Sequence, residues 1–308
     1  MGISEKEVID LVRRTFPSSH PDLILGIGDD AAIFQGRAHQ VVTTDIAVEN
    51  VHFKREWSPA RAIGARTVAA NIADLYAMNS KPQFLLLTVT LTGSESLAWI
   101  SDLLQGIATE ASKSGAVVIG GDTSRGAVFS ISITAIGWAE LPILRSGAQV
   151  GDAIYLSALT GWSAAGLHLL REEISINSAT AEKAIVRYQV PEINYNSDFS
   201  AATSMSDVSD ALLIQGEQMA EASEVRFQID LDLVRAASDF AELSDLADSV
   251  GRNVFDWIIA GGEDHVLLAT GKNLPGLKIG VVQSGAGIHF TQGGREIKMA
   301  PIAWDHFR

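Results

Sequence analysis

The sequence predicts an α/β (α+β) fold with two domains and mixed sheets. Segments typical of strands alternate with segments typical of helices along the 308 residues, as in proteins that pack helices against sheets. The length suits one large or two medium domains, at roughly 150 residues per domain. Pro142, Gly147 and Gly151 cluster in the middle of the chain. We therefore expect a boundary there, between domains 1–140 and 141–308.

The expected elements of the first domain each have a local signal. Ser58 followed by Pro59 predicts a helix start, with serine as the N-cap and proline in the first turn. Gly115 is placed to end a helix at its C′ position. Runs of β-branched residues and strict alternation predict strands. The expected order is a helix at 4–15, a strand at 40–46 with Asp45 at its end, a helix from Ser58 to about residue 78, a strand at 82–91, a helix at 96–113, and strands at 116–120 and 127–139.

The second domain shows the same alternation. Pro191 is expected to end a helix, and Gly261 with Gly262 to turn the chain between a helix and a strand. The polar stretch that begins at Ser204 is expected to start a helix. The expected order is a strand at 152–159, helices at 163–173, 179–189 and 204–223, a strand at 225–233, a helix at 233–250, a helix, turn and strand over 254–270, and short strands at 278–283 and 287–290.

Composition argues against several classes of protein. The formal charge is −14, from 23 Lys and Arg against 37 Asp and Glu, whereas a nucleic-acid binder needs clustered basic residues to neutralise phosphates. The absence of cysteine excludes disulfides, thiolate catalysis, iron–sulfur ligation and cysteine zinc sites. The start of the chain has no signal-peptide pattern, and the apolar runs are too short to span a bilayer. We expect a cytoplasmic protein with no nucleic-acid or membrane partner.

Several carboxylates stand beside glycine, serine and threonine at expected turns, strand ends and helix starts. A carboxylate in apolar or glycine-rich surroundings needs a partner, and few basic residues lie near these positions in the sequence. Mg²⁺ prefers oxygen ligands and is commonly shared with substrate phosphates. The sequence therefore favours divalent cations as the partners. The carboxylates are Asp29, Asp30, Asp45, Asp74, Asp122, Asp207, Asp210, Glu263 and Asp264.

Each of these motifs also has a purely structural interpretation. Asp30 and Glu263 lie in segments that could be simple turns. Asp74 could pair with Arg66, two turns earlier on the same expected helix. Ser209 in the segment SDVSD could cap a helix. The joint occurrence of acidic turns in both halves of the chain favours one composite site between two domains.

No competing catalytic motif is found in the sequence. It lacks a Walker phosphate loop, a GxGxxG turn that opens a helix, an HExxH zinc motif and a GxSxG nucleophile elbow. The seven histidines lack metal-ligand spacing, and only His52 stands out, because it follows the TTD strand. If ATP is used, metals and backbone amides must therefore hold its phosphates.

An ordered set of motifs resembles the thiamine-monophosphate kinases, a family of the aminoimidazole-ribonucleotide-synthetase-like superfamily. The set is specific although no single motif is, and it covers the chain from about Gly26 to Glu263 and on to the closing APIAWDHF. The motifs are GIGDDAA, TTDIAVENVHF, NIADLYAM, IGGDTSRG, ILRSGAQVGD, TGWSAAGL, SDVSDALL and GGEDH.

The resemblance implies an activity and partners. The γ-phosphoryl group of ATP would pass directly to thiamine monophosphate, assisted by several Mg²⁺ ions, in a homodimer joined through the first-domain sheets. The acceptor phosphate has a second pKa near ~6 and is ionised at neutral pH, so no general base is assigned. An ATP-dependent ligase similar to aminoimidazole ribonucleotide synthetase and a catalytically silent nucleotide-binding protein remain alternatives. TTD followed by NVHF, and the closing WDHF, favour the thiamine enzymes over the ligase.

The resemblance also implies roles for individual residues. Metal ligation would fall on Asp30, Thr43, Thr44, Asp45, Asp74, Asp122, Asp207 and Asp210. Nucleotide contacts would fall on Gly121, Asp122, Arg145 and Ser209. Contacts with the thiamine phosphate would fall on His52, Glu263 and Trp304. An indole at the last position suits stacking on a thiazolium or pyrimidine ring.

The sequence departs from the family pattern at four positions. Ala73 stands in NIAD where the family has serine, and Ala211 stands in DVSDALL where it has glycine. His265 and Val266 replace an aromatic residue and a carboxylate beside Glu263. These last changes leave the choice of substrate open, whereas the metal carboxylates are all present.

Overall fold

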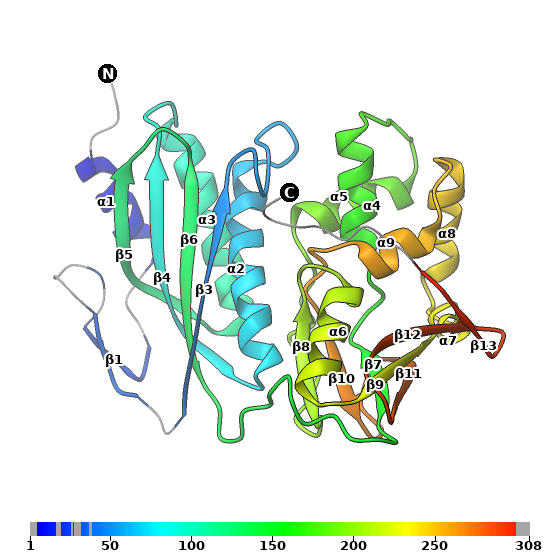
Figure 1. The fold of residues 1–308 in the computed structure, drawn as a ribbon. Helices are drawn as coiled ribbons and strands as arrows, with labels where there is room; N and C mark the ends of the chain where they lie inside the picture. The colour runs from blue at the N-terminus through cyan, green and yellow to red at the C-terminus, as the bar shows by residue number, and fades with distance from the viewer. Residues whose placement is uncertain (1–4, 17–19, 26, 28–31, 37–38, 300–308) are drawn as a thin grey trace. The chain divides into compact units, whose positions relative to one another are not determined.

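The chain forms two compact units, each with its own sheet. Unit 1 takes the residues up to Pro142 except Ala77–Asn79, and unit 2 takes those three residues and everything after Pro142. The fold, drawn in Figure 1, is mixed α and β as expected. The computed structural model describes residues 5–16, 20–25, 27, 32–36 and 39–299.

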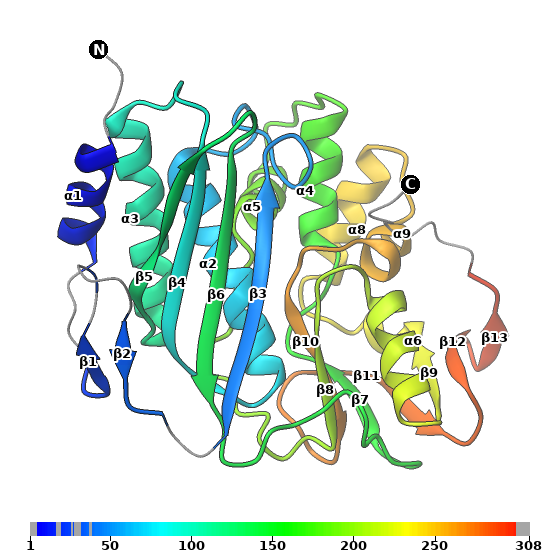
Figure 2. The ribbon, with the colours of Figure 1, turned by 60° about the vertical axis from the view of Figure 1, so that its left-hand side comes forward.

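Unit 1 is built on a four-stranded mixed sheet with helices on one face (Figures 1 and 2). β4 and β5 are parallel, and the other neighbouring strands are antiparallel. Residues of β6 alternate between buried and half-buried, as the sequence predicts, and Ile131, Ile133 and Ala135 are fully buried. In order across the sheet the strands are β3 (Gln40–Val48), β6 (Ser130–Trp138), β4 (Lys81–Leu91) and β5 (Val117–Arg125).

Helices and a small hairpin complete the described part of unit 1. Ser96 caps α3 by accepting a hydrogen bond from the Trp99 backbone N–H, and Gly115 ends the helix at φ 79°, which confirms both predicted helix ends. The predicted helix at the start of the chain is confirmed as α1. The elements are α1 (Glu5–Thr15), β1 (Leu23–Leu25), β2 (Ile33–Phe34), α2 (Ala60–Ala77) and α3 (Leu97–Ser114).

Two glycines let α2 and α3 approach each other closely. A Cβ atom at Gly64 of α2 would overlap the carbonyl oxygen of Leu103, and one at Gly106 of α3 would overlap that of Arg61. Backbone therefore meets backbone at this crossing, which only glycine permits. Since Asp74 lies on α2, this contact also helps to set the position of a candidate site residue.

Unit 2 is built on a seven-stranded mixed sheet that contributes to a large apolar core and to a smaller apolar cluster. β9 and β12 are parallel, and the other neighbouring pairs are antiparallel. Phe227, Ile229, Leu268 and Ile279 of the sheet are fully buried in that core. In order the strands are β13 (Arg295–Ile297), β12 (Gly287–Gln292), β9 (Arg226–Asp230), β11 (Leu277–Gln283), β7 (Ala153–Leu156), β10 (Val266–Gly271) and β8 (Ser204–Val208).

The helices of unit 2 pack their apolar residues against the same core. Ser178 caps α5 and Asn253 caps α9 through side-chain hydrogen bonds to backbone N–H groups. No helix in the described part of the chain is long and apolar enough to cross a membrane. The helices are α4 (Trp162–Arg171), α5 (Ala179–Gln189), α6 (Leu212–Ala222), α7 (Leu231–Val234), α8 (Phe240–Ser249) and α9 (Val254–Ala260).

Two strands of unit 1 are longer than the sequence predicts. β3 continues to Val48 because β6 pairs with it along its whole length, so Asp45 lies inside a strand and not at its end. β5 continues through GGDTSR to Arg125 because it pairs with β4 up to Leu91. The predicted N-cap of α2 was wrong, since the buried hydroxyl of Ser58 has no hydrogen-bond partner among the described residues.

In unit 2 the helix expected at 204–223 is confirmed from Leu212 onward as α6, but its expected start at Ser204 was wrong. Residues Ser204–Val208 form strand β8, which is buried throughout, because β10 pairs with it over its full length. The polar side chains that suggested a cap are buried with partners, as when the Ser204 hydroxyl donates to the Arg145 carbonyl at 2.7 Å. β9 likewise ends at Asp230, whose side chain caps the short helix α7, and β13 was not predicted.

We predict that Gly106→Ala lowers the free energy of unfolding by about 1–3 kcal/mol, because overpacking against backbone outweighs the better helix propensity of alanine. Urea unfolding followed by circular dichroism measures the change. Gly36→Ala is the matched control: its added Cβ would lie 3.7 Å from the Gln40 side chain, an ordinary contact, and it should change stability by less than about 0.5 kcal/mol. Equal stability of both variants would contradict the close crossing.

Candidate functional site

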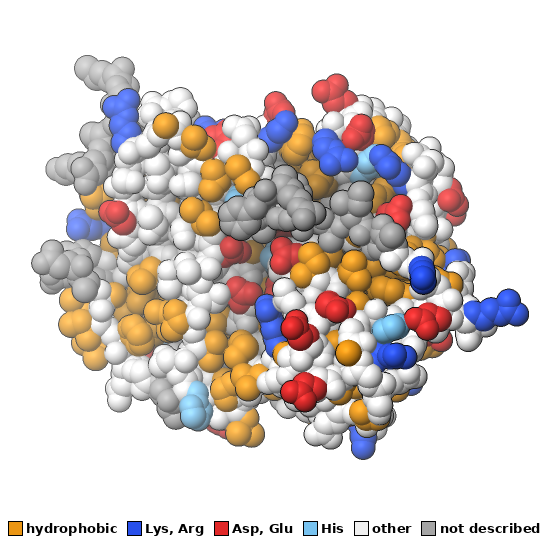
Figure 3. All heavy atoms as spheres, in the orientation of Figure 1, with side chains coloured by type: hydrophobic (Ala, Val, Ile, Leu, Met, Phe, Trp, Pro, Cys, Tyr) orange, Lys and Arg blue, Asp and Glu red, His pale blue; other side chains and the backbone are white. Residues whose placement is uncertain are grey.

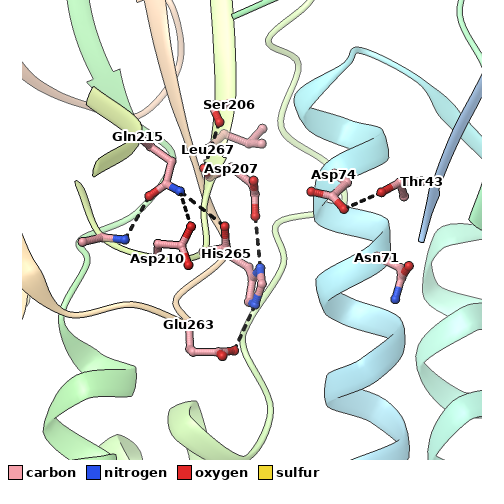
Figure 4. A network of polar contacts seen from close by, with 12 residues as sticks. Thr43, Asn71, Asp74, Ser206, Asp207, Asp210, Gln215, Glu263, His265 and Leu267 are labelled. Atoms are coloured by element: carbon pink, nitrogen blue, oxygen red, sulfur yellow. Dashed lines mark hydrogen bonds and ion pairs between the residues drawn. The ribbon is translucent and has the colours of Figure 1, made fainter. Parts of the chain in front are cut away.

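In unit 1, candidate ligands on β3 and α2 lie next to each other (Figure 4). The Thr43 hydroxyl donates to Asp74 Oδ2 at 2.8 Å. Asp45 lies two residues along β3, and the alternation of the strand places it on the same face as Thr43. Asn71 lies one helical turn before Asp74, and its buried Oδ1 has no hydrogen-bond partner among the residues that the structure describes. This region therefore presents carboxylate, hydroxyl and amide oxygens.

Thr44 lies on the opposite face of the same sheet. Its hydroxyl donates to the Ile133 carbonyl at 3.2 Å and accepts from the Thr134 hydroxyl at 3.1 Å. The three consecutive residues predicted as ligands are thus not brought together by their side chains. Only the backbone of Thr44 could join a site that includes Asp45 and Asp74.

Gly121 and Asp122 lie in β5, at the other edge of the unit 1 sheet. Gly121 has φ 151°, and a Cβ atom there would overlap the Leu87 carbonyl oxygen, so glycine is required. Asp122 is exposed and pairs in register with Thr88 of β4. Since β6 and β4 separate β3 from β5, Asp122 lies about 14 Å from Asp45 at ~4.8 Å per strand.

His52 lies in the loop after β3 and is half-buried. Its Nδ1 accepts a hydrogen bond from the Val48 backbone N–H at 3.1 Å, which orients the ring. Arg55 anchors the same loop through Glu49 at 2.8 Å and Glu95 at 2.6 Å. The loop that carries His52, the predicted substrate contact, is therefore anchored by the ion pairs of Arg55.

The Arg55 guanidinium also stacks on two aromatic rings. Its central carbon lies 4.5 Å from the centre of the Trp99 ring and 5.0 Å from that of Phe129. Burial favours the neutral form of Glu95, but hydrogen bonds from Arg55, Thr92 and the backbone outweigh it and lower the pKa of Glu95 from 4.5 to about 2.

In unit 2, the SDVSD and GGED segments form two turns that meet. The Glu263 backbone N–H donates to the Ser209 carbonyl at 2.5 Å, and that of His265 donates to the Val208 carbonyl at 2.9 Å. A Cβ atom at Gly262 would lie 2.5 Å from the Ser209 oxygen and 2.6 Å from the Asp210 oxygen. Glycine at 262 therefore permits the close approach of the two turns.

His265 joins two of the predicted site residues across these turns (Figure 4). Its Nδ1 lies 3.1 Å from Asp207 Oδ2 and its Nε2 lies 3.3 Å from Glu263 Oε2. Burial alone would lower the pKa of His265, but the hydrogen bonds to the two carboxylates outweigh it and raise the pKa from 6.5 to about 10. The ring is therefore a cation at neutral pH.

Gln215 of α6 holds the rest of the first turn. Its Oε1 accepts from the Ala211 N–H at 2.9 Å, and its Nε2 donates to Asp210 Oδ2 at 3.2 Å and lies 3.5 Å from the Ser209 hydroxyl. Ala211 is the N-cap residue of α6 and makes no side-chain cap, so Ser209 does not cap the helix. The Gln215 side chain instead satisfies the backbone N–H of this N-cap residue.

Asp264 is turned away from Glu263, into the start of α4. Its carboxylate accepts from the Gly161 N–H at 2.6 Å and the Ser163 N–H at 2.9 Å, and burial raises its pKa to about 6 although these bonds oppose the shift. Arg145 is exposed and donates to Gln218 at 2.9 Å. The predicted ligand Asp30 and the predicted substrate contact Trp304 lie outside the described residues.

Sequence reasoning missed three polar residues of this region as contributors. His265 was noted only as a departure from a family pattern, and nothing local marked Gln215 or Asn71. Gln215 lies one turn into α6 from the SDVSD turn, and Asn71 lies one turn from Asp74, so helical spacing was the available signal. Their hydrogen-bonding groups are recognisable only once the strands and helices are assembled.

The donor groups fit Mg²⁺ in kind. Among the described residues, no three His, Cys, Asp or Glu side chains lie close enough together to hold a metal ion by themselves. Mg²⁺ usually takes only one or two carboxylates from the protein and completes its shell with water and phosphate oxygens. The oxygen atoms of Thr43, Asp45 and Asp74, with the orphaned Oδ1 of Asn71 nearby on α2, suit that mode of binding.

The comparison with known families first defines the class of protein. Residues 28–139 match the family model described as AIR synthase related protein, N-terminal domain. The thiamine-monophosphate kinase of Mycobacterium tuberculosis is 36% identical over 276 residues, which cover 87% of this chain and 80% of the relative. The chain therefore belongs to the thiamine-monophosphate kinase family.

Solved structures agree with that assignment. The thiamine-monophosphate kinase from Stenotrophomonas maltophilia K279a matches with a TM-score of 0.81 and 30% identity, over 94% of this chain and 97% of that one. A structure described as AaThiL complexed with AMPPCP and TMP matches with a TM-score of 0.78 and 26% identity, over 98% and 97% of the two chains. The two-domain fold with mixed sheets predicted from the sequence is confirmed at this level.

We predict that Glu95→Gln destabilises the protein at pH 7 and that the difference from the parent protein shrinks in acid. The folded pKa of Glu95 lies below its ordinary value of 4.5, so the ionised group stabilises the fold above about pH 4.5, and this contribution is lost as the pH falls toward 2. Thermal unfolding at pH 7, 5 and 3.5 measures the effect. Glu56→Gln, at an exposed pair with Lys54, is the control. A difference that stays constant with pH would contradict the network.

Proposed function

We propose that this chain transfers the γ-phosphoryl group of ATP to the phosphate of thiamine monophosphate, giving thiamine diphosphate and ADP. Family membership supports the reaction, and the structure of AaThiL complexed with AMPPCP and TMP supports the two ligands for this chain. The observation that carries the proposal is the placement of Thr43 against Asp74, with Asp45 beside them on one face of β3. These side chains present the oxygen atoms that Mg²⁺ prefers as ligands.

We propose that unit 1 binds metal through Thr43, the backbone of Thr44, Asp45, Asp74 and Asp122, together with Asp30, and that Gly121 lies beside the nucleotide. Unit 2 would add Asp207 and Asp210 as metal ligands and Ser209 and Arg145 as nucleotide contacts. His52, Glu263 and Trp304 would hold the thiamine phosphate. When bound, Mg²⁺ would neutralise the repulsion between the donor and acceptor phosphates.

The residues of the chain then act by holding and orienting the reactants. Gly121 is exposed and has no side chain to keep a phosphate from its backbone, and Ser209 offers a hydroxyl in the turn after β8. Glu263 extends from its contact with the buried His265 ring toward solvent, with 39% of its side chain exposed, and so can meet a substrate. An ionised acceptor phosphate needs no proton removed, so positioning and charge neutralisation account for catalysis without a general base.

We further propose that the chain works as a homodimer. Asp45 and Asp122 lie on the two edge strands of the unit 1 sheet, about 14 Å apart, whereas Mg²⁺ binds its ligands at about 2.1 Å. A homodimer that places β5 of one protomer beside β3 of the other would bring the two strands that carry these carboxylates side by side. Val42 and Ile46 are exposed on β3, and Figure 3 shows hydrophobic side chains grouped over this sheet.

The reaction is tested by product formation. The purified chain is mixed with ATP, Mg²⁺ and thiamine monophosphate, and the thiamine phosphates are separated as fluorescent oxidised derivatives. We expect thiamine diphosphate only when all components are present. Asp45→Asn and Asp122→Asn should each lower turnover by at least about 100-fold, in line with the loss of a charged ligand. Asp102→Asn, at an exposed position on α3, should leave turnover unchanged; full activity of both site variants would exclude the metal assignment.

The homodimer is tested by mixing those two inactive variants. A hybrid of an Asp45→Asn chain with an Asp122→Asn chain has one site with both carboxylates and one with neither. Random exchange makes half of the dimers hybrids, so activity should return to about a quarter of the parent level. Differently tagged chains establish that hybrids form. Hybrids that form and remain inactive would show that each chain carries its own complete set.

A further inference from the structure

His265 is the side chain that connects the two candidate carboxylates of unit 2. Asp207 comes from β8 and Glu263 from the turn before β10, so they reach the same ring from different elements. The side chains of Asp207 and His265 are 3% and 4% exposed, whereas that of Glu263 is 39% exposed. The three groups therefore form a chain of contacts that runs from the buried end of β8 to the surface (Figure 4).

The chemistry of the contacts defines what the ring does. Each ring nitrogen lies within hydrogen-bond distance of a different carboxylate, Nδ1 at 3.1 Å from Asp207 and Nε2 at 3.3 Å from Glu263. A planar imidazole keeps its two N–H groups at a constant separation and angle. The oxygen atoms of Asp207 and Glu263 are thereby held in one arrangement, and charge-assisted bonds of this kind are stronger than neutral ones.

The backbone around the ring supports the same arrangement. Glu263 has φ 66° and His265 has φ 51°, both in the left-handed region that side chains other than glycine seldom adopt. The bonds from Glu263 N to the Ser209 carbonyl and from His265 N to the Val208 carbonyl hold this conformation. Unusual backbone conformations of this type persist where the surroundings over-determine them, and they concentrate at functional sites.

We propose that His265 is a positioning residue that fixes Asp207 and Glu263 relative to each other and so couples the metal side of the site to the thiamine side. This inference rests on the proposed function, because that function assigns Asp207 to metal and Glu263 to the substrate. His265 itself touches neither ligand. Its ring acts through the two carboxylates that it holds.

Two substitutions separate the two contacts of the ring. The amide nitrogen of asparagine lies close to the place of histidine Nδ1, and that of glutamine close to the place of Nε2. His265→Asn therefore keeps a donor for Asp207 and loses the one for Glu263, and His265→Gln does the reverse. His265→Phe removes both donors and keeps an aromatic ring.

A second buried histidine of unit 2 provides the matched control. His168 of α4 is 8% exposed, packs against Trp257 and lies 3.4 Å from Arg252 Nε. His168→Phe makes the same change of side chain as His265→Phe, away from the two turns. Any effect that both phenylalanine variants share reports on stability, and only what differs reports on the site.

The kinetic result expected from the proposal is a split between substrates. His265→Asn should raise the KM for thiamine monophosphate about 10-fold or more, with the Mg²⁺ dependence near that of the parent protein. His265→Gln should raise the Mg²⁺ concentration for half-maximal rate about 10- to 100-fold, with a smaller effect on that KM. His265→Phe should show both effects, and His168→Phe neither.

A measurement on the ligand-free protein makes the test independent of turnover. In ¹⁵N-histidine spectra, His265 should show two ring N–H signals protected from exchange. Glu263→Ala should shift one of them and Asp207→Ala the other. Titration of thiamine monophosphate without metal, followed by calorimetry, should show weaker binding by His265→Asn than by His265→Gln.

These results separate the two proposals. A parent protein that makes no thiamine diphosphate would overturn the proposed function, while the two protected signals would still decide the arrangement of His265. A productive parent protein with a single protected signal would overturn the inference alone. The inference would also be overturned if His265→Asn and His265→Gln lowered kcat equally, with no change in the KM for thiamine monophosphate or in the Mg²⁺ dependence. That pattern would report only structural damage.

Discussion

The constraint on which this protein depends is that a carboxylate removed from water must be given donors by the fold. Four acidic groups of the chain meet it in different ways. Asp74 receives the Thr43 hydroxyl, Asp207 receives the His265 ring, Asp264 receives two backbone N–H groups at the start of α4, and Glu95 receives Arg55. Because each donor comes from a different element from its acceptor, these bonds also hold the elements of each unit together.

Close backbone approach is the second requirement, and glycine supplies it. At Gly262 the turn before β10 meets the carbonyl oxygens of the turn after β8, and at Gly106 α3 meets the backbone of α2. Either contact would be blocked by a single methyl group. In both places the close approach sets the position of a candidate ligand, Asp210 beside the first and Asp74 on α2. Packing and chemistry therefore depend on the same small residues.

The arrangement in unit 2 also explains how this chain accommodates a departure from its family. The family pattern that the sequence resembles leads us to expect an aromatic residue beside the GGED turn, and here His265 occupies the position. It keeps a planar ring in a buried space and adds two donors where two carboxylates converge. Burial would ordinarily favour neutral imidazole, but the paired acceptors reverse this and raise the pKa to about 10.

The sequence by itself determined the fold class, most helices and strands, and the family, because periodicity, caps and ordered motifs are local signals. It could not show that Asp45 lies inside β3, that Ser204–Val208 form a buried strand, or that Thr44 and Asp45 point to opposite faces, since pairing partners distant in sequence decide these. Tertiary structure alone decided which polar groups meet. His265 reaches Asp207 across 58 residues of chain, and no local pattern encodes a contact of that range.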